Sequence, residues 1–232
     1  MSDNLQELSI GIQTLEMIRH DNLLYVDKTA RLQKLVTSGK RYFLSRPRRF
    51  GKSLMISTLS AMFSGRIELF KGLAVEQWVK DKAQNPSVVL TFDMSAMNSE
   101  KVENLEQGLT DKVVRTAKKF NLSLVSKTIE GMFEELVEGL YEVHGPLVVL
   151  IDEYDKPMLD NIGDLKTANA MRQALRSFYM GLKSCDQYLG FVMVTGISKF
   201  SKTGVFSALN NLLDSCKFAE NQEVCSRRSS CQ

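Results

Sequence analysis

The sequence predicts an α/β fold, a three-layer sandwich in which helices cover both faces of a mainly parallel central sheet. Apolar strand candidates alternate with amphipathic helix candidates along most of the chain, as in sheets built from β-α units. The strand candidates are continuous in apolar and β-branched residues, for example 87–92 (SVVLTF) and 147–151 (LVVLI), which is typical of strands buried on both faces. The length of 232 residues suits one such domain with a sizeable core.

The predicted elements follow one another in a regular order. Residues 10–38 predict two short helices around the apolar run 23–26, with Asp27 placed to cap the second helix, which begins near Thr29. Strands are predicted at 42–45, 87–92, 147–151 and 188–194, and helices at 52–63, 102–120, 127–143, 166–183 and, shorter, 206–213. We expect a helical lead-in over 1–40, the α/β domain over 41–214 and a disordered polar tail over 215–232.

Composition and charge argue against several classes of protein. A hydrophobic content of 44% and a charged content of 25% are those of an ordinary globular protein. The four cysteines show no paired CxxC spacing and the two histidines lie far from them, which disfavours a zinc site or a disulfide framework. No apolar run reaches the roughly 20 residues of a membrane span, and the polar start lacks the features of a signal peptide. We therefore expect a cytoplasmic protein with no membrane partner.

A basic loop follows the first strand candidate and opens a helix. Six lysines and arginines fall within residues 40–52, which indicates an anionic ligand. In the segment Arg46–Ser53 (RPRRFGKS), the amides of about residues 49–53 would point at an anion on the helix N-terminus, as in a P-loop. Arg46 occupies the position of the first glycine in the usual G-x4-G-K-[ST] pattern. The tripeptide at 51–53 therefore also fits a plain helix start with a solvated lysine.

An acidic pair follows the most apolar strand candidate and supplies the second half of a triphosphate site. In such a site Lys52 would reach the β and γ oxygens, while Ser53 and Asp152 would hold Mg²⁺. Glu153 would orient or deprotonate the attacking water. The alternative is a solvated strand end, with Asp155 and the lysine after it as surface charges. Because the two half-motifs occur in the order of the Walker A and Walker B motifs, we predict a P-loop NTPase.

Further residues are candidates for contact with the γ-phosphate. Thr195 ends the strand candidate 188–194, where a polar sensor of the γ-phosphate or the attacking water would stand, although a threonine there is also an ordinary turn former. Arg48, Arg49 and Arg176 are candidates for stabilising charge on the γ-phosphoryl group. The alternative for Arg176, which lies on the helix 166–183, is an ion pair on the helix surface.

Four motifs together resemble a known family. They are YVDKT at 25–29, SRPRRFGKSL at 45–54, LIDEYDKP at 150–157 and TGISKFSK at 195–202. This combination closely resembles the AAA-ATPase-like proteins, whose members often carry a PD-(D/E)XK nuclease-like domain after the ATPase. The resemblance runs from about Leu8 to Asp214 and implies ATP and Mg²⁺ as the ligands. The nucleotide-binding residues that we then expect are Asp27, Arg48, Arg49, Phe50, Gly51, Lys52, Ser53 and Leu54.

The chain departs from the family pattern after residues 210–214 (NNLLD). From there a polar tail with three of the four cysteines replaces the expected continuation, and no nuclease-like domain remains. A truncation or a change of reading frame near Ser215 is the expected origin of such an ending.

Three functions remain open. The first is an ATPase that binds Mg-ATP and hydrolyses it to drive a conformational change. The second is a nucleotide-binding regulatory or assembly module with little turnover, which the degenerate loop favours. The third is a nucleic-acid-binding protein that uses the basic loops 46–52 and 199–202, and it ranks last because no groove-reading element accompanies them. ATP is the expected partner, a homo-oligomer or a protein partner is a further candidate, and nucleic acid is expected only as an indirect partner.

Overall fold

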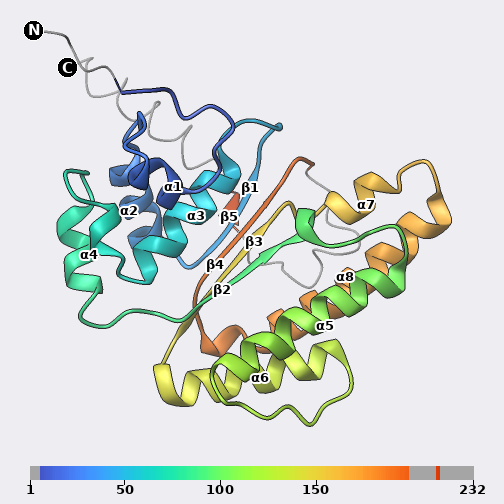
Figure 1. The fold of residues 1–232 in the computed structure, drawn as a ribbon. Helices are drawn as coiled ribbons and strands as arrows, with labels where there is room; N and C mark the ends of the chain where they lie inside the picture. Colours follow the sequence, from blue (N-terminus) through green and yellow to red (C-terminus); the bar gives the residue numbers. More distant parts are fainter. Residues whose placement is uncertain (1–5, 199–212, 215–232) are drawn as a thin grey trace, which may run out of the picture.

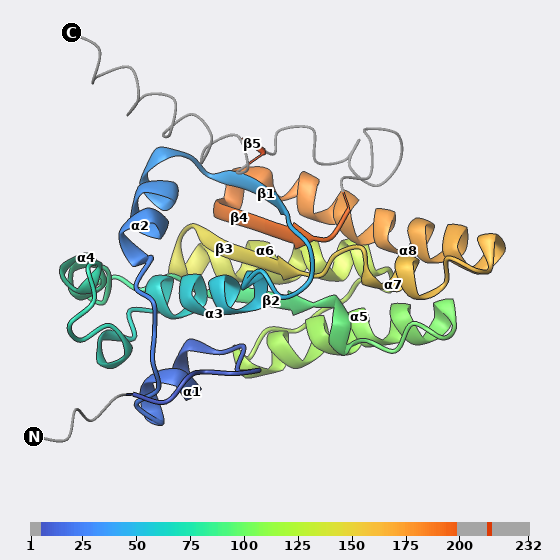
Figure 2. The ribbon, with the colours of Figure 1, turned by 90° about the horizontal axis from the view of Figure 1, so that it is seen from above.

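A computed structural model describes residues 6–198 and 213–214 of the chain, and its centre is a parallel sheet (Figure 1). The strands are β1 (Arg41–Ser45), β2 (Val89–Asp93), β3 (Leu147–Asp152), β4 (Leu189–Gly196) and β5 (Leu213–Asp214). Their order in the sheet is β2-β3-β4-β1-β5, and every neighbouring pair is parallel. Figure 2 shows β5 beside β1 at one edge and β2 at the other. The predicted fold class is confirmed.

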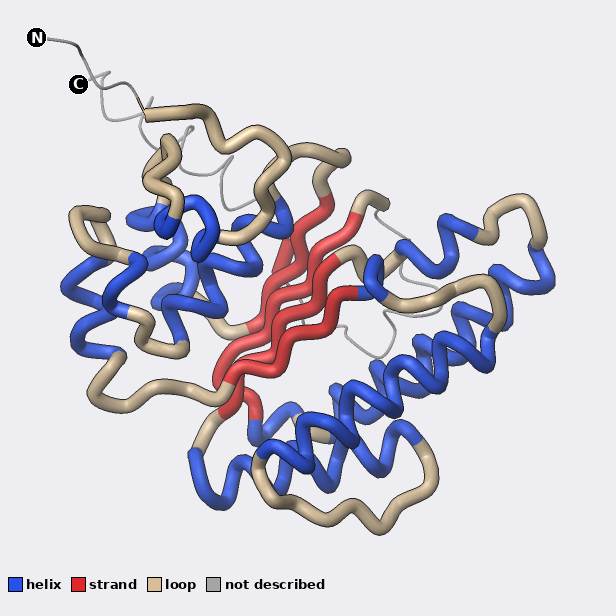
Figure 3. The backbone as a smooth tube through the Cα atoms, viewed as in Figure 1, coloured by secondary structure: helices blue, strands red, loops and turns tan. Residues whose placement is uncertain are grey.

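Helices cover both faces of the sheet (Figure 3). One face carries α1 (Leu15–His20), α2 (Thr29–Ser38), α3 (Lys52–Phe63) and α4 (Glu76–Lys82). The other face carries α5 (Val102–Lys119), α6 (Ile129–His144) and α8 (Leu165–Ser184). The shorter elements are α7 (Lys156–Asp160) and the 3-10 turns η1 (Ile67–Leu69), η2 (Met94–Ala96) and η3 (Asp186–Tyr188). Within the described residues, no helix combines the length and the apolar character that a membrane crossing needs.

Strand β3 shows why the strands appear in the sequence as continuous apolar runs. All of its residues are buried. Because successive side chains of a strand point to opposite faces, Val148 and Leu150 pack in the core on the α3 face. Val149 and Ile151 pack in the core under α5, α6 and α8. Both faces therefore require apolar residues, and the strand becomes polar only at Asp152, its last residue.

The connections between the strands diverge at one place. From β1 the chain crosses through α3 and α4 to β2 at the far edge, and from there it returns through α5 and α6 to β3. Right-handed crossovers that run in opposite directions along a sheet place their helices on opposite faces. The loop after β1 and the loop after β3 therefore leave the sheet toward opposite faces, on either side of the carboxyl end of β4. Open α/β sheets bind ligands where neighbouring loops leave in opposite directions.

The predicted elements match the structure closely where they are long. The helix predicted at 52–63 has the same bounds as α3, and the four predicted strands correspond to β1, β2, β3 and β4. The sequence pattern predicts no helix or strand in the segment 64–86, which contains η1 and α4. The helix predicted at 206–213 is wrong at Leu213, which begins β5, and its other residues lie outside the described part, as do 199–202 and the tail 215–232.

Candidate nucleotide-binding site

The loop between β1 and α3 has the backbone of an anion-binding turn. Arg49 and Gly51 both have positive φ angles, 66° and 74°. For the arginine this conformation costs roughly 1–2 kcal/mol. Residues with positive φ that alternate with residues of negative φ bring successive backbone N–H groups to one side of the loop, where they can bind an anion. The start of the loop is held because Arg46 donates its backbone N–H to the carbonyl of Gly196, the last residue of β4, at 3.1 Å.

Lys52 is buried at the centre of this loop. Its side chain is 5% exposed, and Nζ donates to the carbonyl oxygens of Arg46 and Pro47, both at 3.0 Å. No carboxylate of the described residues forms an ion pair with it. The alternative of a solvated lysine is therefore wrong. A buried ammonium group that bonds only carbonyl oxygens of its own loop is ready to exchange them for an anionic ligand.

Asp152 and Thr195 meet where β3 and β4 end. These strands pair in register up to Ile151 and Val194, so the next residue of each strand lies at the same level. The hydroxyl of Thr195, which is fully buried, donates to Asp152 Oδ1. The same oxygen accepts the backbone N–H of Glu153 at 3.0 Å. No described residue donates to Oδ2 of this carboxylate, so one oxygen is oriented and the other keeps its bonding capacity.

Glu153 follows directly and has the chemistry of a general base. Its backbone φ is 50°, an uncommon conformation that turns the chain sharply at the end of the strand. Burial raises the pKa of its carboxyl group, and the neighbouring carboxylates of Asp152 and Asp93 raise it further. The charge of Lys52 opposes this rise. The two half-motifs, about a hundred residues apart in sequence, lie close together in the fold, because Ser53 and Asp152 line the same cavity.

A cavity of about 330 Å³ lies between α3 and the carboxyl ends of β2 and β3. Ser53, Asp152 and Asp93 all line it. Asp93 directly follows the strand candidate 87–92 and was not predicted as a site residue. Its register partner in the sheet is Asp152, and this pairing brings it there. Within the described residues no cluster of three or more His, Cys, Asp or Glu could hold a metal. One hydroxyl and one carboxylate suit Mg²⁺, which keeps several waters and takes its other ligands from phosphates.

A second cavity, of about 360 Å³, opens on the other flank of the loop. Loop residues Phe50 and Gly51 line it together with Leu54 of α3 and with Tyr25 and Val26 of the lead-in. Phe50 is 68% exposed although it is a large apolar side chain. This pocket therefore offers aromatic and aliphatic surface next to the anion-binding turn, as a flat organic ring requires.

Comparison with known proteins agrees with this geometry. A family model described as a predicted AAA-ATPase matches residues 9–206. The chain belongs to the AAA-ATPase-like family. It is 38% identical over 211 residues to a protein of Azotobacter chroococcum mcd 1 named for its position in the vnfD 5′ region. This match covers 90% of the chain and 40% of the relative, so the chain spans less than half of that protein. As a member of the AAA-ATPase-like family, the chain is a nucleotide-binding, P-loop ATPase-like domain.

The structure comparison gives a more distant neighbour. It is the Aeropyrum pernix ORC1 protein in complex with DNA, with a TM-score of 0.41 and 11% sequence identity. The similarity covers 82% of this chain and 44% of that one. A similarity this low does not bear on function.

Not every residue predicted for the site lies at the cavities. Arg48 and Arg49 are exposed on the loop, beside the site. Arg176 is exposed on α8, the helix that covers the opposite face of the sheet from α3, so it is not brought to the loop. Asp27 lies one residue before the N-cap of α2, and its Oδ1 accepts the backbone N–H of Thr29, the first residue of the helix, at 2.8 Å. Its Oδ2 accepts the backbone N–H of Ala74 at 2.8 Å, so both oxygens have structural partners.

The AAA-ATPase-like motif DEYDKP contains a contact that the sequence analysis missed. Asp155, considered there as a surface charge, is fully buried. Its Oδ2 accepts the backbone N–H groups of Ile197 and Ser198, at 2.9 and 2.8 Å, and the Ser198 hydroxyl at 2.7 Å. Tyr154 donates its hydroxyl to the carbonyl of Ser198 at 2.9 Å. We call this group of contacts the β4 latch. It fastens the chain after β4 to the acidic end of β3.

Proposed function

We propose that the chain binds Mg-ATP at the carboxyl edge of the sheet and hydrolyses it. The observation that carries this proposal is that Ser53, at the start of α3, and Asp152, at the end of β3, line one cavity beside the buried Lys52. A buried cation, a hydroxyl, an oriented carboxylate and a second carboxylate of raised pKa are the parts that triphosphate hydrolysis uses. We propose Glu153 and Lys52 as the catalytic residues and Thr195 as the residue that positions Asp152, and we leave out Arg176.

The phosphates would lie on the loop. The amides of residues 49–53 would donate to them at the N-terminus of α3, where the helix dipole favours an anion. Lys52 would exchange its bonds to the carbonyls of Arg46 and Pro47 for bonds to phosphate oxygens. Arg48 and Arg49 are exposed close by and are free to approach the γ-phosphate.

Ser53 and Asp152 would hold Mg²⁺ through the hydroxyl and Oδ2. When bound, the ion neutralises charge on the phosphate oxygens as the terminal bond breaks. Thr195 orients Asp152 for this task through Oδ1. Glu153 would accept a proton from the attacking water, and its raised pKa makes it a stronger base than an exposed glutamate.

The base would occupy the apolar pocket beside the loop. Phe50, Leu54 and Tyr25 line it, which supports the expectation that Phe50 and Leu54 belong to the nucleotide site. The lead-in residues 1–40 would then form one ATPase unit with residues 41–214. In support of this, the backbone N–H of Leu15 in α1 donates to Ser57 Oγ in α3 at 3.0 Å.

Hydrolysis would be coupled to a conformational change through the β4 latch. Asp152 and Glu153 lie next to Tyr154 and Asp155, which bind Ser198. A change in charge at the site would therefore alter the contacts that hold the chain after β4.

The alternative function, a regulatory module with little turnover, is favoured by one observation: Lys52 already has two hydrogen-bond partners within its own loop.

A phosphate-release assay with matched binding measurements distinguishes these functions. Wild-type protein is compared with Lys52→Ala, which should lose ATP binding, and with Glu153→Gln, which should retain binding and lose turnover. Wild-type turnover no greater than that of Glu153→Gln, with binding intact, would assign the regulatory function. Unchanged ATP affinity in Lys52→Ala would contradict the proposed site.

A further inference from the structure

The edge strand β2 is open along its outer side. It pairs only with β3 among the described strands. The carbonyl of Val88 accepts the backbone N–H of Val148, so Val88 directs its backbone groups toward β3. Because this direction alternates along a strand, Val89 and Thr91 direct their N–H and C=O groups outward. No described residue pairs with these groups.

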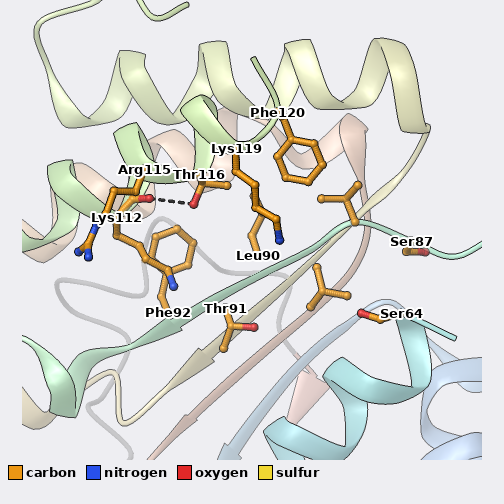
Figure 4. Close-up of a pocket in the computed structure, with 12 residues that line it drawn as sticks. Ser64, Ser87, Leu90, Thr91, Phe92, Lys112, Arg115, Thr116, Lys119 and Phe120 are labelled. Atoms are coloured by element: carbon orange, nitrogen blue, oxygen red, sulfur yellow. Dashed lines mark hydrogen bonds between the residues drawn. The ribbon is translucent and has the colours of Figure 1, made fainter. Parts of the chain in front are cut away.

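A groove follows this edge. A cavity of about 590 Å³ lies between β2 and α5, and a second of about 530 Å³ continues it toward the carboxyl end of the strand. Thr91, Lys112 and Arg115 line both cavities, so the two are continuous. Figure 4 shows the side chains of the first part, with α5 along one side and β2 along the other.

Basic side chains line the α5 side of the groove. Lys112, Arg115 and Lys119 lie at helical spacing and line the first cavity, which contains no acidic residue. Within the described residues none of the three forms an ion pair with a carboxylate. The second cavity adds Asp93 and Asp111, so the positive charge is concentrated along the first part of the strand.

We propose that this groove binds an extended acidic segment of a partner protein, which adds to the sheet as a strand beside β2. Its backbone would pair with Val89 and Thr91. Its acidic side chains would lie on the α5 side, over Leu90 and Phe92, and face the three basic residues.

The spacing of the charges fits such a strand. Lys112 and Lys119 are separated by seven residues, about 10.5 Å along a helix. Alternate residues of a strand lie on one face about 6.7 Å apart, so three acidic residues at alternate positions span about 13 Å. A segment with the pattern acidic-x-acidic-x-acidic therefore presents charge along the whole basic row.

The groove favours a peptide over nucleic acid. Open N–H and C=O groups of an edge strand match another peptide backbone, whereas a phosphate chain offers acceptors only. The basic row contains three cations, and two carboxylates follow it in the same groove. A nucleic acid that continued along the groove would meet these carboxylates.

The test uses a ten-residue peptide that alternates Glu with Val, carries a fluorophore and is titrated with the full chain by anisotropy. The control peptide has Lys in place of each Glu and should not bind. Two more peptides carry N-methyl groups on all Glu or on all Val residues. In a strand, the N–H groups of alternate residues point to the same side. One of these two N-methylated peptides should therefore lose binding, and the other should retain it. Equal affinities for the two N-methylated peptides would overturn strand pairing.

The charge contribution is tested on the protein. Reversal of all three charges (Lys112→Glu, Arg115→Glu and Lys119→Glu) should weaken binding by about tenfold or more at low salt, because each attraction becomes a repulsion. The control makes the same change of charge at Lys101, Lys118 and Lys127, which are exposed and do not line the groove.

The outcomes separate the inference from its alternatives. Equal peptide affinity in the two triple variants would overturn it. Failure of the Glu peptide to bind, together with binding of a 20-nucleotide single strand that the groove variant loses, would overturn it in favour of nucleic acid. Absence of any binding would also overturn it. ATP turnover of the groove variant should equal that of wild type, so this test is independent of the proposed ATPase activity.

Discussion

Thr195 and Asp152 join the ends of β4 and β3, because the threonine hydroxyl donates to Oδ1 of the buried aspartate. The same oxygen also accepts the N–H of Glu153. The orientation of the carboxylate is therefore set by a neighbouring strand and by its own following residue. Both bonds lie at the carboxyl edge, where the loops after β1 and β3 diverge.

The variant Thr195→Val should show what the hydroxyl contact contributes apart from the packing of the side chain. Valine has nearly the same shape but no donor, and loss of a bond to a buried acceptor costs about 1–3 kcal/mol of the free energy of unfolding. If Asp152 holds Mg²⁺, the metal concentration for half-maximal turnover should rise about tenfold or more, as for other residues that orient metal ligands. Denaturant unfolding and Mg²⁺ titrations measure the two effects. Thr195→Ser keeps the hydroxyl and should remain near wild type in both; a serine variant as impaired as the valine variant would contradict this role.

Turnover should decrease in acid because of Glu153. Burial and Asp152 raise the pKa of Glu153, and a general base works only when deprotonated. Activity should therefore be lost as the pH falls through this raised pKa, at a higher pH than for an exposed glutamate. Asp93 also raises this pKa, so Asp93→Asn should move the acid limb of the kcat profile to lower pH. If the acid limb of the kcat profile lies at the same pH in Asp93→Asn as in wild type, a group other than Glu153 controls it.

Breaking the β4 latch should loosen the chain after β4. In Asp155→Asn the amide oxygen can still accept from Ile197 and Ser198, but these bonds lose the charge of the carboxylate. The NH2 group would take the place of Oδ1, which is buried and has no hydrogen-bond partner in the described part of the chain. We expect a loss of roughly 2–3 kcal/mol in the free energy of unfolding. We also expect faster hydrogen exchange at these two amides. Asp160→Asn, which removes a surface ion pair with Lys156 and weakens a hydrogen bond from the Ser99 hydroxyl, is the control and should change neither quantity appreciably.

The contribution of Asp27 to stability should depend on pH. Burial tends to raise the pKa of this carboxyl group, but hydrogen bonds from Thr29 and Ala74 outweigh it and the pKa is lowered. A lowered folded-state pKa stabilises the fold above the unfolded-state value, and this stabilisation is lost as the pH falls through the folded-state value. Asp27→Ala should therefore lower the free energy of unfolding at pH 7 by about 1–2 kcal/mol, the usual effect of losing a helix cap.

Urea unfolding of this variant and of wild type at neutral and acidic pH provides the measurement. The difference between the two proteins should shrink as the pH falls below the folded-state pKa of Asp27. A difference that is constant across this range would assign the effect to packing instead of charge.

The sheet and the long helices could be predicted because their patterns are local. The continuous apolar run of β3 follows from burial on both faces, and α3 follows from its loop and its helical spacing. The α4 helix has seven residues, two turns, which is too short for a periodic pattern to stand out from the surrounding turns.

The candidate site could be predicted only in part. The sequence predicts Lys52, Ser53 and Asp152 as site residues because each lies at the start of a helix or at the end of a strand. Asp93 and Asp155 were missed as site residues because their roles depend on partners that only the folded sheet brings near. Arg176 shows the opposite error, since spacing along a helix does not indicate that the helix covers the other face of the sheet.

The carbonyl bonds of Lys52 have a thermodynamic consequence for ligand choice. A nucleotide does not meet a hydrated ammonium group here, because it competes with two carbonyl oxygens of the loop. The exchange conserves the number of hydrogen bonds that Lys52 donates, so its driving force is the negative charge that the ligand adds. Affinity should therefore increase steeply with the number of phosphates, and a nucleoside alone should gain little from this loop. The loop would then discriminate among nucleotides by their charge, largely independently of the base.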